Sequence, residues 1–118
     1  MKLNHINLIV SNVAEAVEFF KSYFNFTCTE IKGDNIIAVL SGTDGFTLVL
    51  MKSKEAPIHY PVNFHIGFLL DSEANVIATH SKLKAGGINL TSEPKKIRDS
   101  FGFYFSFDEV MIEVGCYL

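Results

Sequence analysis

The sequence predicts an α+β fold in which two βαβββ modules form a curved mixed sheet with the helices outside. One observation is an internal repeat: the segment Asn-His-Ile-Asn-Leu-Ile-Val from Asn4 is echoed by Phe-His-Ile-Gly-Phe-Leu-Leu from Phe64. Another is the order of patterns in each half, where a strand-like segment precedes a segment of helical spacing and then three short strand-like segments. Turn signals rich in Gly, Asp and Asn separate the strand-like segments of the first half. This order favours helices packed beside a sheet.

The first half begins with an apolar, β-branched strand over residues 3–10. Asn12, with Glu15 three residues later, is typical of a helix start. Apolar residues at helical spacing extend this helix to Tyr23 or Phe24, with its end near Asn25. The strands expected next span residues 27–31, 36–41 and 46–51.

The second half repeats this order after a proline-containing connection without periodicity. A strand over residues 64–70 precedes a helix that Asp71 or Ser72 caps and that Gly86 and Gly87 end. The strands expected next span residues 88–90, 101–107 and 111–114.

The length and composition indicate one domain. A chain of 118 residues, 48% of them hydrophobic, has ample material for a core. The predicted organisation is a single domain over residues 1–118, with modules at 1–52 and 63–118 and a connector at 53–62.

The charge pattern favours a small-molecule partner. Ten Lys and Arg against 13 Asp and Glu give a net charge of −3, without the basic surface that nucleic acids or anionic membranes require. No stretch approaches the roughly 20 apolar residues of a membrane span, and no signal-peptide pattern opens the chain. We therefore expect a cytoplasmic protein. Cys28 and Cys116 have no metal or redox spacing and are expected to be free thiols.

The repeat extends to a set of four equivalent positions. The offset is 60 residues between His5 and His65 and 64 residues between Val49 and Glu113, which a loop insertion explains. Two neutral imidazoles and a carboxylate suit Fe(II), Mn(II), Ni(II) or Zn(II) and leave coordination positions for substrate oxygens. The alternative is structural: His65 and Glu113 form a buried hydrogen-bonded pair, and His5 packs as a core histidine.

Three short motifs, in this order and at this spacing, resemble the vicinal oxygen chelate superfamily, which groups glyoxalases, bleomycin resistance proteins and extradiol dioxygenases. The motifs are Asn-His-Ile from Asn4, Leu-Lys-Ala-Gly-Gly-Ile from Leu83 and Met-Ile-Glu-Val from Met111. The resemblance implies a divalent metal in the concavity of the sheet, held by His5, His65 and Glu113, with no other cofactor. It also implies a homodimer.

Two positions depart from the family pattern. Val49 stands where members similar to glyoxalase I commonly carry Glu or Gln, and the sequence from Ser106 to Val110 replaces the usual Asp-Pro-Asp-Gly-Asn turn. The first departure disfavours a glyoxalase I activity and leaves a set of three ligands. It also leaves no general base at the position equivalent to Glu113.

Further side chains are weaker candidates for the site. The candidate catalytic residues are Tyr104, as a proton donor, and Asn7 and Thr47, which could orient a substrate. The candidate substrate-binding residues are Val49, Met51, Lys95 and Arg98, the last two in a mixed-charge loop that could cover an anionic substrate. His59 and His80 lack repeat-related partners and are expected to be exposed. The aromatic run from Phe101 to Phe107 should divide between both faces of its strand.

Two functions follow from these patterns. The first is a divalent-metal-dependent enzyme of the lyase, isomerase, transferase or oxygenase type that acts on an oxygen-chelating small molecule. The second is a metal-free dimer that sequesters a small molecule, as the bleomycin resistance branch does. Fold alone does not decide between them.

Overall fold

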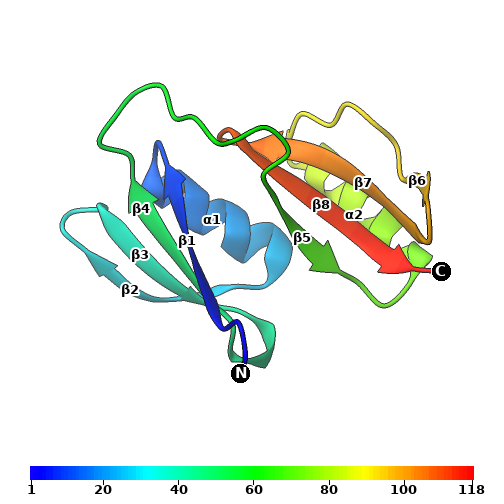
Figure 1. Cartoon of the computed structure of the whole chain (residues 1–118), viewed down its shortest axis with the longest axis horizontal. Coiled ribbons are helices and arrows are strands. Elements are labelled where there is room, and N and C mark those ends of the chain that lie inside the picture. Colours follow the sequence, from blue (N-terminus) through cyan, green and yellow to red (C-terminus); the bar gives the residue numbers. More distant parts are fainter. The chain divides into compact units, whose positions relative to one another are not determined.

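The computed structural model describes residues Met1–Leu118 as two compact units, Met1–Ile58 and His59–Leu118. Each unit contains one four-stranded mixed sheet with one helix against it (Figure 1). The strand order is β1-β4-β3-β2 in the first sheet and β5-β8-β7-β6 in the second. In each sheet the first two strands of this order run parallel and the others pair antiparallel. The predicted α+β class and the two βαβββ modules are confirmed.

The elements follow the predicted order. The first unit contains β1 (His5–Val10), α1 (Val13–Phe24), β2 (Thr27–Lys32), β3 (Ile37–Ser41), a short 3-10 turn η1 (Thr43–Gly45) and β4 (Thr47–Lys52). The second contains β5 (His65–Leu69), α2 (Glu73–Ala85), β6 (Lys95–Ile97), β7 (Ser100–Phe107) and β8 (Val110–Tyr117). Neither α1 nor α2 has the length and apolar composition of a membrane-spanning helix.

Each core lies between a helix and one face of its sheet. In the first unit, alternate residues of the strands are fully buried beneath α1, among them Leu8, Leu40 and Leu50. In the second unit, Ile112 and Val114 of β8 are buried in the same way beneath α2. Fully burying one such side chain stabilises the fold by roughly 1.5–3 kcal/mol. In each unit, no helix packs against the opposite face of the sheet. Side chains on that face therefore need not be apolar.

Caps explain where the helices begin and end. The side chains of Asn12 and Ser72 accept hydrogen bonds from backbone N–H groups three residues later, at 3.0 and 3.1 Å. Helix α1 ends at Phe24 and is capped by Asn25, whose φ of 58° is left-handed. Helix α2 ends in a Schellman motif, in which the N–H of Gly87 donates to the carbonyl of Lys84 and the N–H of Ile88 donates to that of Leu83.

The sixth strand was wrongly predicted. Residues 88–90 form no strand, because the N–H of Ile88 completes the cap of α2. Strand β6 is instead Lys95–Ile97, within the segment that was expected to be a mixed-charge loop, and it pairs antiparallel with the start of β7. Charged residues on a short edge strand are compatible with pairing on one side and water on the other.

The predicted exposure of His80 was also wrong, whereas His59 is exposed as expected. The His80 side chain is buried, its ring meets Phe103 edge-on at 4.8 Å, and Nε2 bonds to the Ser92 carbonyl at 2.9 Å. His80 lies 60 residues after the core residue Phe20, which is the repeat offset. The histidine therefore holds a core position of α2 and ties the segment before β6 to the helix.

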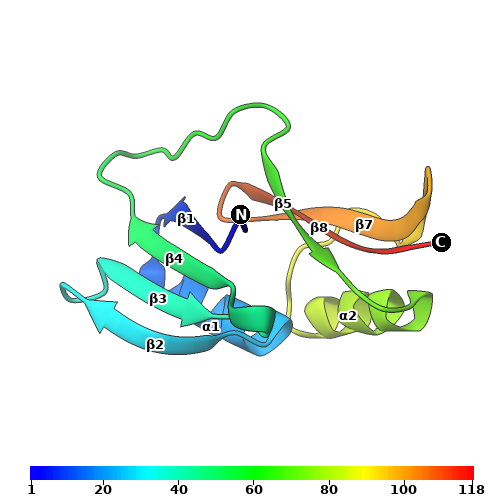
Figure 2. The same cartoon turned by 60° about the horizontal axis from the view of Figure 1, so that its bottom comes forward.

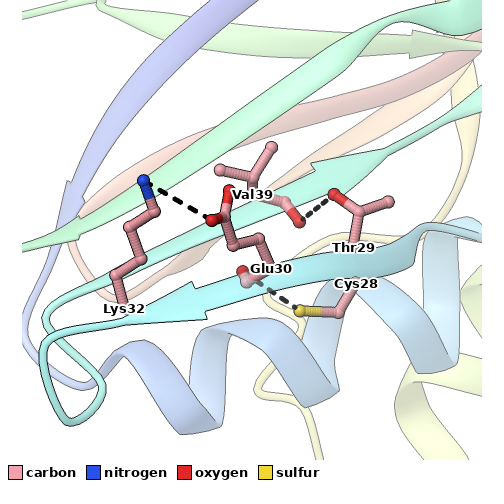
Figure 3. Close-up of polar contacts among 5 residues, drawn as sticks. All are labelled: Cys28, Thr29, Glu30, Lys32 and Val39. Carbon is pink, nitrogen blue, oxygen red and sulfur yellow. Dashed lines mark hydrogen bonds and ion pairs between the residues drawn. The ribbon is translucent and has the colours of Figure 1, made fainter.

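A β-bulge interrupts β2 at one edge of the first sheet. Figure 3 shows the polar contacts around it. The register between β2 and β3 shifts between Cys28 and Glu30, and the Thr29 hydroxyl donates to the Val39 carbonyl at 3.1 Å. Beyond the bulge, Lys32 pairs with Glu30 at 3.4 Å in an exposed position, where an ion pair contributes little stability. A bulge and charged side chains on an edge strand are features that disfavour pairing with another chain.

Candidate functional site

The second sheet has an open face on the side opposite α2 (Figure 2). Because strand residues alternate, His65 and Gly67 of β5 share this face with Glu113 of β8 and Tyr104 of β7. The strand register places Gly67, Glu113 and Tyr104 in one row across three strands. The aromatic run divides between the two faces of β7, as predicted. Its four Phe residues alternate on the face toward α2, and Tyr104 lies on the open face.

His65 and Glu113 form the central pair of this face. His65 Nε2 lies 3.5 Å from Glu113 Oε1, and their side chains are 40% and 30% exposed. His65 Nδ1 lies 2.9 Å from the Asn63 carbonyl, which can only accept, so Nδ1 carries a proton. In neutral imidazole, Nε2 then presents a lone pair to a carboxylate oxygen. Two facing acceptors require a proton or a cation between them.

His5 is held in the same tautomer in the first unit. Its Nδ1 lies 2.7 Å from Asn4 Oδ1, so the ring donates to this oxygen through Nδ1 and leaves Nε2 as the free acceptor. His5 is exposed at the start of β1, in register with Thr47 of β4. Orientation of one ring nitrogen by a carbonyl or amide is typical of metal-binding histidines.

The remaining candidates of the first unit lie on the open face of its sheet. Asn7 is exposed beside Val49, and Val49 and Met51 are half-buried next to the apolar β3 residues Val39 and Ile37. This row, Asn7-Val49-Val39, contains no titratable group. This row can offer a ligand apolar contacts and the side-chain amide of Asn7.

Tyr104 has an altered acidity. Burial, a hydrogen bond to Glu113 and the negative charge of Glu113 raise the pKa of Tyr104 above its usual 10.0, while the charge of Arg98 acts in the opposite direction. Tyr104 therefore keeps its proton at neutral pH. It can donate a hydrogen bond or a proton, as predicted for this residue, but cannot act there as a base.

A cavity of about 460 Å³ adjoins Tyr104 and Glu113. Arg98, in the tight turn between β6 and β7, lines it together with Ser100 and Tyr117. Lys95 lies at the other end of β6, exposed and paired with Gly102. The cavity thus combines one guanidinium with hydroxyl groups and two carboxylates, those of Asp99 and Glu113.

The donor set fits a divalent metal in chemistry but is incomplete in the second unit alone. His65 and Glu113 supply one nitrogen and one oxygen that face each other, which is the arrangement a cation stabilises. No group of three or more His, Cys, Asp or Glu side chains is placed to hold an ion. The predicted pair within the second unit is thus brought together, and the third predicted ligand, His5, belongs to the first unit.

Two kinds of residue escaped the sequence analysis. Asn4 and Asn63 orient the two imidazoles, and their positions one and two residues before a histidine were the available signal. Gly67 and Gly115, which flank Glu113 on the open face, show no pattern beyond strand alternation. Their role depends on neighbouring strands, which the sequence does not reveal.

Comparisons with known proteins agree with this fold. The sequence profile of the Glyoxalase/Bleomycin resistance protein/Dioxygenase superfamily matches residues 2–114. A solved structure described as a possible glyoxalase from Bacillus cereus is 39% identical with a TM-score of 0.83, covering 98% of this chain and 99% of that one. The search of curated proteins gave no match.

Structures of FosX, a genomically encoded fosfomycin resistance protein from Listeria monocytogenes, are similar in fold. One is 21% identical with a TM-score of 0.80 and covers 100% of this chain and 94% of that one. A FosX variant in complex with Mn(II) and 1S,2S-dihydroxypropylphosphonic acid is 21% identical with a TM-score of 0.77, covering 96% of this chain and 90% of that one.

Proposed function

Because the chain belongs to the glyoxalase, bleomycin resistance protein and dioxygenase superfamily, we propose that it is a divalent-metal-dependent enzyme acting on an oxygen-chelating small molecule. The proposed ligands are His5, His65 and Glu113. The proposed reaction is of the lyase, isomerase, transferase or oxygenase type, the range of chemistry that this scaffold supports. We propose further that the protein acts as a cytoplasmic homodimer.

The facing acceptors of His65 and Glu113 carry the proposal. An imidazole whose proton is fixed on Nδ1 by the Asn63 carbonyl directs its lone pair at a carboxylate 3.5 Å away. A cation between them would turn this repulsion into two bonds. The matching tautomer of His5 supports its assignment as the third ligand. The Mn(II) complex of the FosX variant supports a metal from the set Fe, Mn, Ni and Zn.

Side chains around the proposed metal site bind the substrate and donate a proton. A bound ion would polarise the substrate oxygens. The Tyr104 phenol, which keeps its proton near neutral pH, donates a hydrogen bond or a proton to an oxygen that becomes negative. The Arg98 guanidinium attracts an anionic substrate group into the cavity beside Tyr104, with Lys95 as a second cation on β6. Asn7 and Thr47 contribute orienting hydrogen bonds, and Val49 and Met51 contribute apolar contacts.

Elemental analysis tests the proposal. The native protein, purified without chelator and reconstituted with Mn, Fe, Ni or Zn, should hold about one ion per chain, since three side chains define one site. The His5→Ala and Glu113→Ala variants should lose it. His59→Ala removes an exposed histidine of the connector and should retain the ion. A native protein without stoichiometric metal, with unchanged thermal stability after reconstitution, would refute the proposal.

The second candidate function is the metal-free binding dimer. The half-buried apolar residues Val49 and Met51, which pair with Val39 and Ile37 in the first sheet, favour it. In that case neither His5→Ala nor Glu113→Ala should change ligand affinity. Binding of an apolar ligand by metal-free protein, with a native affinity preserved in Glu113→Ala, would support this alternative.

A further inference from the structure

Gly67 is a glycine that neither the backbone nor the packing of the second unit requires. It lies in the middle of β5 with an ordinary extended backbone. A Cβ atom there would have Glu113 Oε1 as its nearest neighbour, at 3.6 Å, which is ordinary van der Waals contact. Glycine inside a strand is destabilising and often marks a place where a ligand or another segment approaches closely. The presence of glycine at position 67 therefore needs an explanation other than local packing.

Gly102, on β7, shows what a structural glycine looks like in the same sheet. A Cβ atom there would lie 2.2 Å from the Val114 carbonyl oxygen, which no side chain could tolerate. Gly115 is an intermediate case, because its Cβ would lie 3.2 Å from the Phe101 carbonyl oxygen. Strand pairing thus explains Gly102 and explains Gly115 in part, but it does not explain Gly67.

The first unit supplies an internal comparison for Gly67. The equivalent position, 60 residues earlier, is Asn7, which pairs with Val49 as Gly67 pairs with Glu113. The same strand in the same kind of sheet therefore accepts a side chain. The position without a side chain, Gly67, occurs in the unit that carries Glu113 and Tyr104.

An open cavity of about 230 Å³ lies over these glycines. Its lining includes Gly67, Leu69, Ser100, Glu113, Gly115 and Tyr117. Leu69 and Tyr117 are 63% and 77% exposed, so apolar side chains border a floor of bare peptide groups. The volume is below the roughly 300–1,000 Å³ of pockets for drug-sized ligands, which indicates a group about the size of a single ring.

We propose that Gly67 and Gly115 form the floor of a substrate subsite for a flat, conjugated group that carries the chelating oxygens. This inference rests on the proposed metal-dependent function. A flat group can contact peptide planes over its whole face only where no Cβ atom intervenes, and each close contact adds dispersion attraction. The cavity reaches Glu113, so adjacent oxygens on the group would lie beside His65 and Glu113.

The test compares two chelators on the full chain loaded with Mn(II), by calorimetric titration. Maltol has adjacent oxygens on a planar ring, and acetohydroxamate has adjacent oxygens without a ring. Gly67→Val should weaken maltol binding about tenfold or more, the size of effect that an excess alkyl group has in a pocket. Gly67→Ala should have a smaller effect. The affinities for acetohydroxamate and Mn(II) should stay within about twofold of native, since neither occupies the floor.

Each outcome decides the proposal. Equal maltol affinity in native protein and Gly67→Val, with Mn(II) bound by both, would refute the subsite and leave the metal site intact. Loss of both chelators in Gly67→Val, at unchanged melting temperature, would also refute a ring subsite. Failure of the native protein to bind any of Mn, Fe, Ni and Zn would refute the proposed function and the subsite together. If Gly67→Val unfolds early, Gly67→Ala decides by the same comparison, because its Cβ fits.

Discussion

The open faces of the two sheets share a strand register but differ in chemistry. In the first unit the central row across three strands is Asn7-Val49-Val39. In the second, the same row is Gly67-Glu113-Tyr104, with His65 Nε2 3.5 Å from the carboxylate. The helix-covered faces, in contrast, are apolar in both units. Stability constrains the face beneath the helix, whereas half-exposed positions on the open face are free to diverge.

This difference shows how a duplicated scaffold can divide its roles. Each unit retains one histidine at the start of its first strand, with Nδ1 held by a neighbouring oxygen acceptor. The second unit adds a carboxylate, a phenol and the guanidinium of Arg98. Most of the polar chemistry of the proposed site therefore belongs to one half of the chain.

The largest expected effect concerns the apolar core between helix and sheet, which each unit has. Phe20→Ala should lower the free energy of unfolding by about 3–5 kcal/mol, because a fully buried aromatic ring leaves a cavity. Urea denaturation measures this change. Glu18→Ala, on the exposed side of the same helix, is the matched control and should change stability by less than about 0.5 kcal/mol. Similar values for the two variants would show that α1 does not cover the core as described.

Glu113→Val converts the second row to the pattern of the first. Metal affinity should fall by at least about 100-fold, since losing even an outer-shell partner costs roughly 10–100-fold. Competition titration with a fluorescent metal indicator measures it. The apo variant should fold normally, because valine suits a strand and the replaced side chain is only 30% exposed. Retention of native metal affinity would remove the proposed distinction between the units.

His80→Phe makes α2 resemble α1, where the equivalent residue is Phe20. The variant should lose about 1–2 kcal/mol, because the Ser92 carbonyl loses its hydrogen bond from the imidazole. Hydrogen exchange should also become faster in residues 88–94, which His80 ties to the helix. Unchanged stability and exchange would mean that the histidine serves only as an apolar filler.

The smallest expected effect is a pH dependence of the second unit. Because the pKa of Tyr104 is raised in the folded protein, folding opposes loss of the proton, and stability should fall as pH rises above about 10. Tyr104→Phe removes the phenol and should weaken that fall. Urea denaturation at pH values between about 9 and 11 compares the two. Coincident profiles would show that Tyr104 is not held in the environment described.

Much of this architecture could be predicted from local signals. Helix α1 was predicted from Asn12, Glu15 and the apolar spacing, and its observed end at Phe24 agrees. The division of the aromatic run from Phe101 to Phe107 between the two faces of its strand followed from strand alternation. These features depend on residues close together in sequence, which is why a single sequence was sufficient.

The failures depend on contacts between distant residues. Ile88 has a strand-like sequence context, but its N–H completes the cap of α2. His80 is polar, but the Ser92 carbonyl and the Phe103 ring compensate for its burial. The sequence signal for this burial is the core residue Phe20, which lies 60 residues earlier at the equivalent helix position. Strand neighbours likewise decide the role of Gly67, so the cavity beside it could not be predicted.

The central claim is that two histidines and one carboxylate bind one ion, with unequal contributions from the two units. Electron spin-echo envelope modulation of the Mn(II)-loaded protein measures it most directly, because it detects coordinated imidazole nitrogen. The native protein should show two histidine nitrogens, and His5→Gln and His65→Gln should each show one. Absence of imidazole modulation from the native protein, or a spectrum unchanged in both variants, would contradict the claim.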